Sequence, residues 1–128
     1  MNCVGWYFAR LGSYQEALIY CHQALALHQE IGDEVDEAGT WDSLGYIHHH
    51  LGARQKAIAC YRQAVLLFQK AGDRYFEADT LNRLAEAHYS AGDFESARLL
   101  WERAMAILDQ LGHRQADDIR AKLKHLNA

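Results

Sequence analysis

The chain has 128 residues, a net charge of −4 and no proline. This acidic balance argues against contact with nucleic acid, because nucleic-acid-binding modules concentrate basic residues on one face. No apolar run approaches the length of a membrane span, and the first residues lack the pattern of a signal peptide. Three cysteines (Cys3, Cys21 and Cys60) have no metal or redox spacing. We therefore expect a cytoplasmic domain with reduced cysteines that contacts neither a membrane nor nucleic acid.

Two series of glycines divide the chain, and within each series the step is forty residues. The glycines are Gly12, Gly52 and Gly92 in one series, and Gly32, Gly72 and Gly112 in the other. Glycine often supplies the left-handed residue that ends a helix, so each glycine predicts a helix end. Helices should then begin near residues 14, 34, 54, 74, 94 and 114, after a first helix at the start of the chain.

Residues beside these glycines are typical of helix starts. Ser13 and Glu16 have the spacing of a capping box, and Asp33, Asp73 and Asp93 stand where an N-cap is expected. Within the helices, apolar residues recur every three or four positions, which is typical of one buried helical face. Alanines keep the forty-residue step, and at a fixed position they allow two helices to approach closely. These alanines are Ala17, Ala57 and Ala97, and Ala24, Ala64 and Ala104.

The sequence thus predicts an all-α solenoid of three helical hairpins. The hairpins should span about residues 1–32, 33–72 and 73–112. A capping helix should follow at about 114–126, with Ile119, Leu123 and Leu126 as its apolar strip and charged residues outside. The first hairpin begins already inside the repeat pattern, so we expect the chain to be a fragment of a larger protein.

The second hairpin resembles the tetratricopeptide repeat, and the likeness extends over nearly the whole chain. Its matching residues are Trp41, Leu44, Gly45, His48, Gly52, Ala57, Tyr61 and Ala64. The third hairpin matches through Leu81, Leu84, Ala85, His88, Gly92, Ala97, Trp101 and Ala104. The usual unit has about 34 residues and often ends in proline, whereas this unit has forty and no proline.

The extended units look most like the C-terminal arrays of large actinobacterial transcriptional regulators. Phrases such as TWDSLGYIHHHLG and GDRYFEADTLNRLAEAH carry this resemblance. In those regulators a DNA-binding region and a nucleotide-binding switch domain precede the repeats. The resemblance implies a sensor or regulatory module that binds a protein or peptide, or other domains of the same polypeptide.

In tetratricopeptide arrays the first helix of each hairpin lines a concave groove. The outward-facing residues of these helices are therefore the expected partner-binding site. They are Trp6, Arg10, Asp42, Tyr46, His49, Phe76, Asp79, Asn82, Arg83, Glu86 and Tyr89. Aromatic rings between polar groups suit a peptide, and the three carboxylates in this set favour a basic or amide-rich ligand.

Eight histidines raise the alternative of a metal site. No two of them have the three- or four-residue spacing that places helical ligands on one face. His48 and His88 stand at the family's buried aromatic position and are interpreted as packing residues, while His49 or His50 with Glu86 remains the alternative metal site. No catalytic or phosphate-binding motif is present, so we expect neither an enzyme nor a cofactor.

The alternative function is a structural scaffold that self-associates and leaves its groove empty. If a preceding repeat is missing, the first helix should expose an apolar side made by Val4, Tyr7, Phe8 and Leu11. Exposed apolar patches often recruit a partner, so this end of the array predicts a homo-oligomer. The sequence upstream of Met1 in the parent gene would discriminate between a regulator and a simple repeat scaffold.

Overall fold

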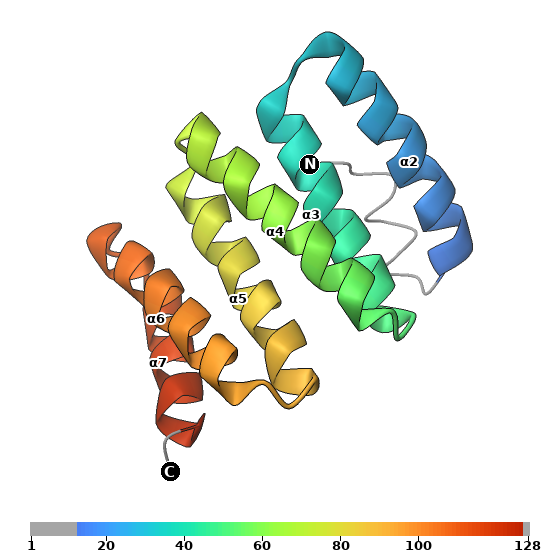
Figure 1. Ribbon diagram of the computed structural model, residues 1–128. Helices are drawn as coiled ribbons and strands as arrows, with labels where there is room; N and C mark the ends of the chain where they lie inside the picture. Colours follow the sequence, from blue (N-terminus) through green and yellow to red (C-terminus); the bar gives the residue numbers. More distant parts are fainter. Residues whose placement is uncertain (1–12, 127–128) are drawn as a thin grey trace.

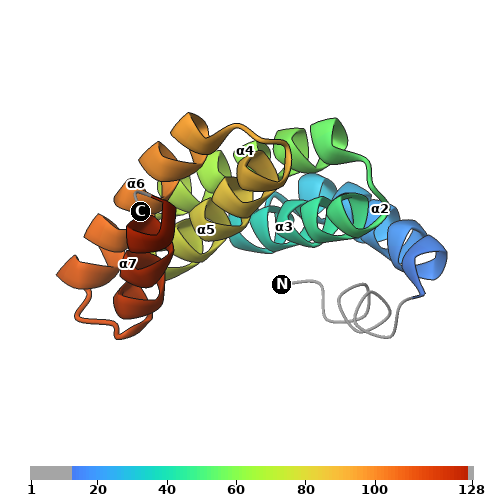
Figure 2. The ribbon, with the colours of Figure 1, turned by 90° about the horizontal axis from the view of Figure 1, so that it is seen from below.

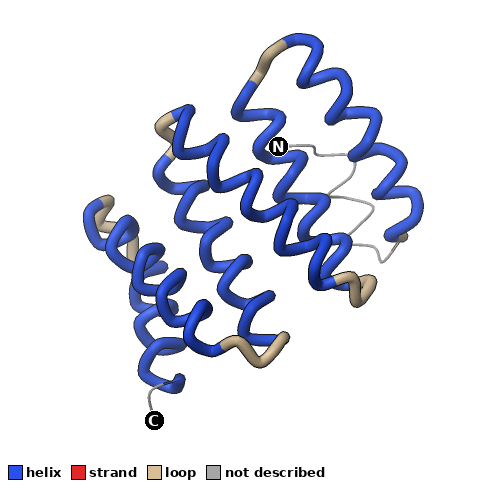
Figure 3. Tube along the Cα trace, viewed as in Figure 1, coloured by secondary structure: helices blue, strands red, loops and turns tan. Residues whose placement is uncertain are grey.

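The computed structural model describes residues 13–126, which form a row of six helices (Figure 1). The helices are α2 (Tyr14–Ile31), α3 (Glu34–His50), α4 (Arg54–Ala71), α5 (Arg74–Ser90), α6 (Phe94–Gln110) and α7 (Gln115–Leu126). The part of the chain that the structure describes contains no strand (Figure 3). Every predicted helix start within it is confirmed to within one residue. The predicted first helix lies outside the described residues.

Glycines end the helices as the sequence predicts. The five glycines that follow helices α2 to α6 all have positive φ, between 66° and 83°. Residues other than glycine rarely adopt this left-handed backbone conformation. Because glycine adopts it readily, the chain can reverse after each helix without strain. The glycines are Gly32, Gly52, Gly72, Gly92 and Gly112.

Aspartate side chains begin three of the helices, which confirms the predicted N-caps. Each carboxylate accepts a hydrogen bond from the backbone N–H three residues later. The bonds join Asp33 to Asp36, Asp73 to Phe76 and Asp93 to Ser96, at 3.1, 3.2 and 3.2 Å.

The predicted capping box at Ser13 is wrong. Its hydroxyl makes no cap hydrogen bond, and its ψ of 65° is lower than the ψ of the three capping aspartates, 77° to 99°. The Ser13 hydroxyl is therefore without the bond to the backbone N–H of Glu16 that a capping box requires.

Consecutive helices pack against each other and form an arch, which Figure 2 shows from below. Helices α3, α5 and α7 lie along the inner side of the arch, and α4 and α6 lie along the outer side. Helices α3 and α5 also touch each other directly. Five of the six predicted contact alanines are completely buried, which lets the helix backbones approach; Ala24 is half-buried. The buried five are Ala17, Ala57, Ala64, Ala97 and Ala104.

The tightest approach in the hairpin α3–α4 is between Gly45 and Tyr61. A Cβ atom built on Gly45 would lie 2.6 Å from two carbons of the Tyr61 ring, well inside van der Waals contact. The ring itself is buried, with 2% of its surface exposed. Glycine at this position therefore allows the tyrosine ring to lie directly on the backbone of α3.

Helix α7 closes the array as expected. Ile119 and Leu123 are buried in one cluster with Trp101 and Ala104 of α6, and Leu126 packs against that cluster. The outer side of α7 is charged, and Arg120 pairs there with Asp109 of α6 at 2.9 Å. A polar outer face of this kind keeps the last helix of a solenoid compatible with water.

Candidate functional site on the concave face

The residues expected to bind a partner come mainly from the inner helices of the arch. Helix α3 carries Asp42, Tyr46 and His49, and helix α5 carries Phe76, Asp79, Asn82, Arg83, Glu86 and Tyr89. Trp6 and Arg10 lie outside the described residues. The placed side chains differ in exposure and pairing, so they do not form one uniform surface.

Asp42 is not the outward-facing carboxylate that the sequence suggested. Only 4% of its surface is exposed, and Arg83 of the neighbouring helix α5 approaches it at 3.2 Å. Arg83 also pairs with Asp79 at 2.9 Å. Burial raises the pKa of Asp42 to about 6, although the nearby guanidinium acts in the opposite direction. These residues link α3 to α5, so Asp42 is structural and unavailable to a basic ligand.

Phe76 also contributes to packing more than the sequence suggested. Its ring stacks on Phe68 of α4 with centroids 5.6 Å apart, and it is half-buried against the cluster that contains Ala38 and Ala64. Its contact with Phe68 and this cluster places Phe76 against α4, so its ring is only partly available to a ligand.

Asn82 and Glu86 are joined to the last helix by Lys122. The ammonium group donates to Asn82 Oδ1 at 2.9 Å and to Glu86 Oε1 at 2.7 Å. Trp101 Nε1 donates to the same Asn82 oxygen at 2.9 Å. Sequence reasoning missed Lys122, yet the forty-residue step that relates Asp42 to Asn82 leads on to Lys122. The repeat phase was the signal that could have found it.

A cavity of about 420 Å³ opens beside this group, between α5, α6 and α7. Its lining residues are Glu86, Tyr89, Trp101, Ala121, Lys122 and His125. The rings of Tyr89 and Trp101 lie 5.9 Å apart, and Lys122 Nζ lies 5.9 Å from the centre of a Trp101 ring. The walls are thus mainly apolar, with a carboxylate and an ammonium group at the edge. This combination can hold an apolar side chain while it orients a polar backbone.

Tyr46 and His49 stand at the other end of the concave face. The ring of His50 lies 4.1 Å from the ring of Tyr46 and stacks on Tyr14 of α2 at 5.8 Å. Partial burial and neighbouring His50 lower the pKa of His49, so burial favours its neutral form. These rings form an aromatic group at the end of α3, separate from the cavity at α7.

Histidines and carboxylates do not converge on a metal site within residues 13–126. No group of three His, Cys, Asp or Glu side chains in this range has the arrangement of metal ligands. His88 has the packing position expected for it: the side chain is buried, and Nδ1 lies 3.3 Å from an Asp93 carboxylate oxygen. His48 is half-buried. No helix among these residues has both the length and the apolar character to cross a membrane.

Solved structures of repeat proteins superpose well on this chain. The tetratricopeptide repeat domain of Arabidopsis FLU has 20% identity and a TM-score of 0.77, with 84% of this chain and 90% of that chain covered. BtubC (BKLC) from P. vanneervenii has 24% identity and a TM-score of 0.87, with 98% and 53% covered. A putative kinesin light chain repeat protein from Podosopora anserina has 18% identity and a TM-score of 0.79, with 96% and 62% covered. At these identities the likeness shows a shared fold.

Sequence comparison identifies the family more directly. A comparison with curated proteins gives no match. The family description "Tetratricopeptide repeat" matches residues 36–110, and a second description of the same repeat matches residues 1–31. Domains of this kind are protein-interaction modules, and nothing in the comparisons indicates a catalytic site. With the repeated hairpins and the concave inner face, these matches show that the chain belongs to the tetratricopeptide repeat family.

Proposed function

We propose that the array binds a protein or peptide segment on its concave face, with the cavity between α5 and α7 as the anchor point. The observation that carries this proposal is the pairing of two aromatic walls, Tyr89 and Trp101, with the polar edge made by Glu86 and Lys122. Aromatic anchors in pockets contribute most of the energy at many interfaces. The cavity accepts one large apolar side chain of the partner.

The polar edge limits the charge that the bound segment of the partner can carry. Lys122 is neutralised by Glu86, and Arg83 is neutralised by Asp42 and Asp79. A ligand with a strong charge of either sign would have to displace one of these pairs. The preferred segment is therefore neutral or weakly basic around its apolar anchor. This is a narrower class of ligand than the basic or amide-rich one expected from the sequence.

A peptide selection followed by titration tests the anchor. Binders from a phage-displayed random peptide library are titrated by calorimetry against the native chain, Tyr89→Ala and Tyr20→Ala. Tyr20 is a tyrosine on α2 with nearly the same exposure as Tyr89, 42% against 39%, so it controls for loss of a surface ring. We expect Tyr89→Ala to weaken binding by about 1 to 3 kcal/mol and Tyr20→Ala to have no effect. Equal affinities for all three proteins would overturn the anchor assignment.

The wider context that we propose is the regulatory C-terminal region of a bacterial, actinobacterial-type transcriptional regulator in the cytoplasm. Its partner would then be a protein segment or a nucleotide-binding switch domain of the same polypeptide. This part of the proposal rests on the sequence phrases quoted above. Sequencing the parent gene upstream of Met1 tests it, and the presence of further repeats alone would count against it.

Self-association is the second candidate function, and one observation on α2 favours it. Ile19, Leu27 and Ile31 expose 58%, 53% and 67% of their surfaces at this end of the array. The patch expected from Val4, Tyr7, Phe8 and Leu11 lies outside the described residues. Sedimentation velocity over a range of concentrations, repeated with Ile19→Ser and Leu27→Ser, tests this candidate. A monomer at every concentration would exclude it.

A further inference from the structure

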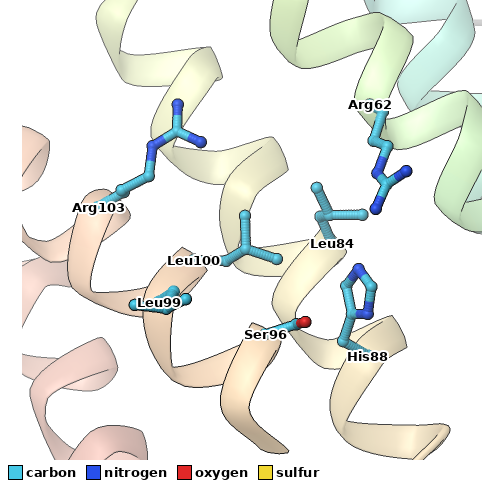
Figure 4. Close-up of a pocket in the computed structure, with 7 residues that line it drawn as sticks. All are labelled: Arg62, Leu84, His88, Ser96, Leu99, Leu100 and Arg103. Atoms are coloured by element: carbon cyan, nitrogen blue, oxygen red, sulfur yellow. The ribbon is translucent and has the colours of Figure 1, made fainter. Parts of the chain in front are cut away.

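A second hollow lies on the outer side of the arch, between α4 and α6. Two cavities of about 440 and 250 Å³ share four lining residues, Arg62, Leu84, Leu100 and Arg103, and so form one continuous furrow. Figure 4 shows Arg62 and Arg103 on opposite sides of Leu84 and Leu100. We name this feature the outer furrow.

The outer furrow has an apolar floor and apolar edges. Leu81 and Leu84 of α5 are buried at its base. Leu66 of α4 and Leu99 of α6 line it as well, and they expose 60% and 55% of their surfaces. Exposed leucines that border a hollow are typical of a surface that a partner covers.

Two arginines, Arg62 and Arg103, flank this apolar strip. Helix α4 carries Arg54, Lys56, Arg62 and Lys70 and no acidic residue, although the whole chain has a net charge of −4. No carboxylate within residues 13–126 forms an ion pair with Arg62. The nearest carboxylate to Arg103 is that of Glu77, at 4.0 Å, and Gln69 already donates to it at 3.1 Å. Both arginines can therefore pair with carboxylates of a partner.

The repeat itself does not require these residues. Forty residues earlier, the positions of Arg62 and Arg103 are occupied by His22 and Gln63. In the same way, the positions of Leu66 and Leu99 are occupied by alanines, Ala26 and Ala59. Helices α2, α4 and α6 still begin forty residues apart, at Tyr14, Arg54 and Phe94. The arginines and leucines are therefore specific to one junction of the array and are not needed to form these helices.

We propose that the outer furrow is a second docking site, for an amphipathic helical segment of a partner protein. The segment presents leucine-like side chains to the furrow floor and carboxylates to Arg62 and Arg103, as helices do when they bind in grooves. The apolar floor favours this occupant over nucleic acid, whose backbone offers phosphates but no apolar face to cover the leucines. This site is independent of the concave cavity and does not rest on the proposed function.

Fluorescence anisotropy with a designed peptide tests the site. The probe is a fluorescein-labelled helix of about four turns, with leucines on one face and glutamates on both flanks, and its control carries lysines in place of the glutamates. The protein variants are Arg62→Glu with Arg103→Glu, and Lys124→Glu as a charge control on α7, where Lys124 is exposed. Circular dichroism verifies that each variant is folded.

We expect the double arginine variant to bind the glutamate peptide at least about tenfold more weakly, because reversed charges at a contact repel. It should instead gain affinity for the lysine peptide, while Lys124→Glu leaves both affinities nearly unchanged. The proposal is overturned if the native chain does not bind the glutamate peptide, or if it binds both peptides equally. Tighter, arginine-dependent binding of a labelled DNA duplex would also overturn it and assign the cations to nucleic acid.

Discussion

The hairpins α3–α4 and α5–α6 lie forty residues apart in the sequence and differ in what they leave open. They share the buried alanines that set the helix spacing, Ala57 and Ala97 among them. They differ at several pairs of positions that lie forty residues apart and are equivalent in the repeat. The pairs are Gly45 and Ala85, Tyr61 and Trp101, Asp42 and Asn82, Ala59 and Leu99, Gln63 and Arg103, and Ala53 and Asp93.

These differences make α3–α4 a closed hairpin, in which side chains pack directly on the facing helix, and α5–α6 an open one, which lines a cavity. In α3–α4, the Tyr61 ring lies on the backbone at Gly45, and Asp42 is buried beside Arg83. In α5–α6, Trp101 instead donates to Asn82 and forms a wall of the concave cavity. The same hairpin also supplies Leu99 and Arg103 to the outer furrow, which it shares with Arg62 and Leu66 of α4. The repeat thus sets the backbone, and departures from it create the candidate binding surfaces.

Changing Gly45 should have the largest effect on stability. Gly45→Ala places a methyl group 2.6 Å from the Tyr61 ring, and that ring belongs to a residue that is only 2% exposed. We expect the free energy of unfolding to fall by about 2 to 3 kcal/mol, as overpacked cores do. Urea unfolding followed by circular dichroism measures the change.

The open hairpin supplies the control for this change. Ala85→Gly should lower stability by about 1 to 2 kcal/mol, because glycine inside a helix is unfavourable and a buried methyl group is lost. Adding Tyr61→Leu to Gly45→Ala should reduce the damage, since the ring is the source of the clash. If Gly45→Ala is stabilising, by up to about 1 kcal/mol from helix propensity, the ring yields and the close approach is not required.

Asp42→Asn should change the pH dependence of stability, and it makes the closed hairpin resemble the open one, which has Asn82. Burial raises the pKa of Asp42 from 3.8 to about 6 in the folded state. The folded protein then holds a proton that the unfolded chain releases, so stability is lost as the pH rises from about 4 to about 6. The loss should be on the order of 3 kcal/mol in the native chain and absent in Asp42→Asn.

The difference between the two proteins removes the contribution of titrating residues that lie away from Asp42, and leaves that of Asp42 with its partners Arg83 and Asp79. Unfolding free energies at intervals between pH 4 and 7 should show Asp42→Asn gaining relative to the native chain as the pH rises. A gain of the native chain over this range would mean that attraction to Arg83 outweighs burial. A constant difference would mean that Asp42 titrates normally.

Local residues explain why the fold could be predicted so fully from the sequence. Glycine at a left-handed position and aspartate at an N-cap act within a few residues, so Gly72 and Asp73 mark the boundary between α4 and α5 without reference to the rest of the chain. Ser13 has the right residue type, but its side chain makes no cap bond. Whether a capping side chain adopts the bonded geometry is a property of the folded chain and cannot be read from residue type.

The candidate surfaces depend on contacts between helices, and the sequence indicates them less well. A helical projection places Asp42 and Asn82 at equivalent positions, yet one is buried by Arg83 and the other is bonded to Lys122. The burial and bonding of each residue depend on which long side chain of the next inner helix contacts it. The outer furrow was not expected, because its exposed leucines, Leu66 and Leu99, lie on the second helices of the hairpins, whose outer faces are usually solvated. Whether the expected concave residues bind a partner stays a prediction.

The smallest expected effect is a stabilisation, and it also follows from the comparison of the two hairpins. The N-cap residue of α4 is Ala53, which offers no side-chain cap, whereas the N-cap residue of α6 is Asp93, whose carboxylate accepts from Ser96 N–H. The two residues have nearly the same backbone, with φ and ψ of −90° and 69° at Ala53 and −89° and 77° at Asp93.

Ala53→Asp should therefore form the missing bond to the N–H of residue 56 and raise the free energy of unfolding by about 0.5 to 1 kcal/mol. A carboxylate there also lies near Arg54 and Lys56 at the positive end of the helix, which adds to the gain. Urea unfolding should show a higher midpoint at an unchanged slope, and Ala53→Asn, which can cap without charge, separates the two contributions. A midpoint that does not rise with either residue would show that α4 is held by its packing alone.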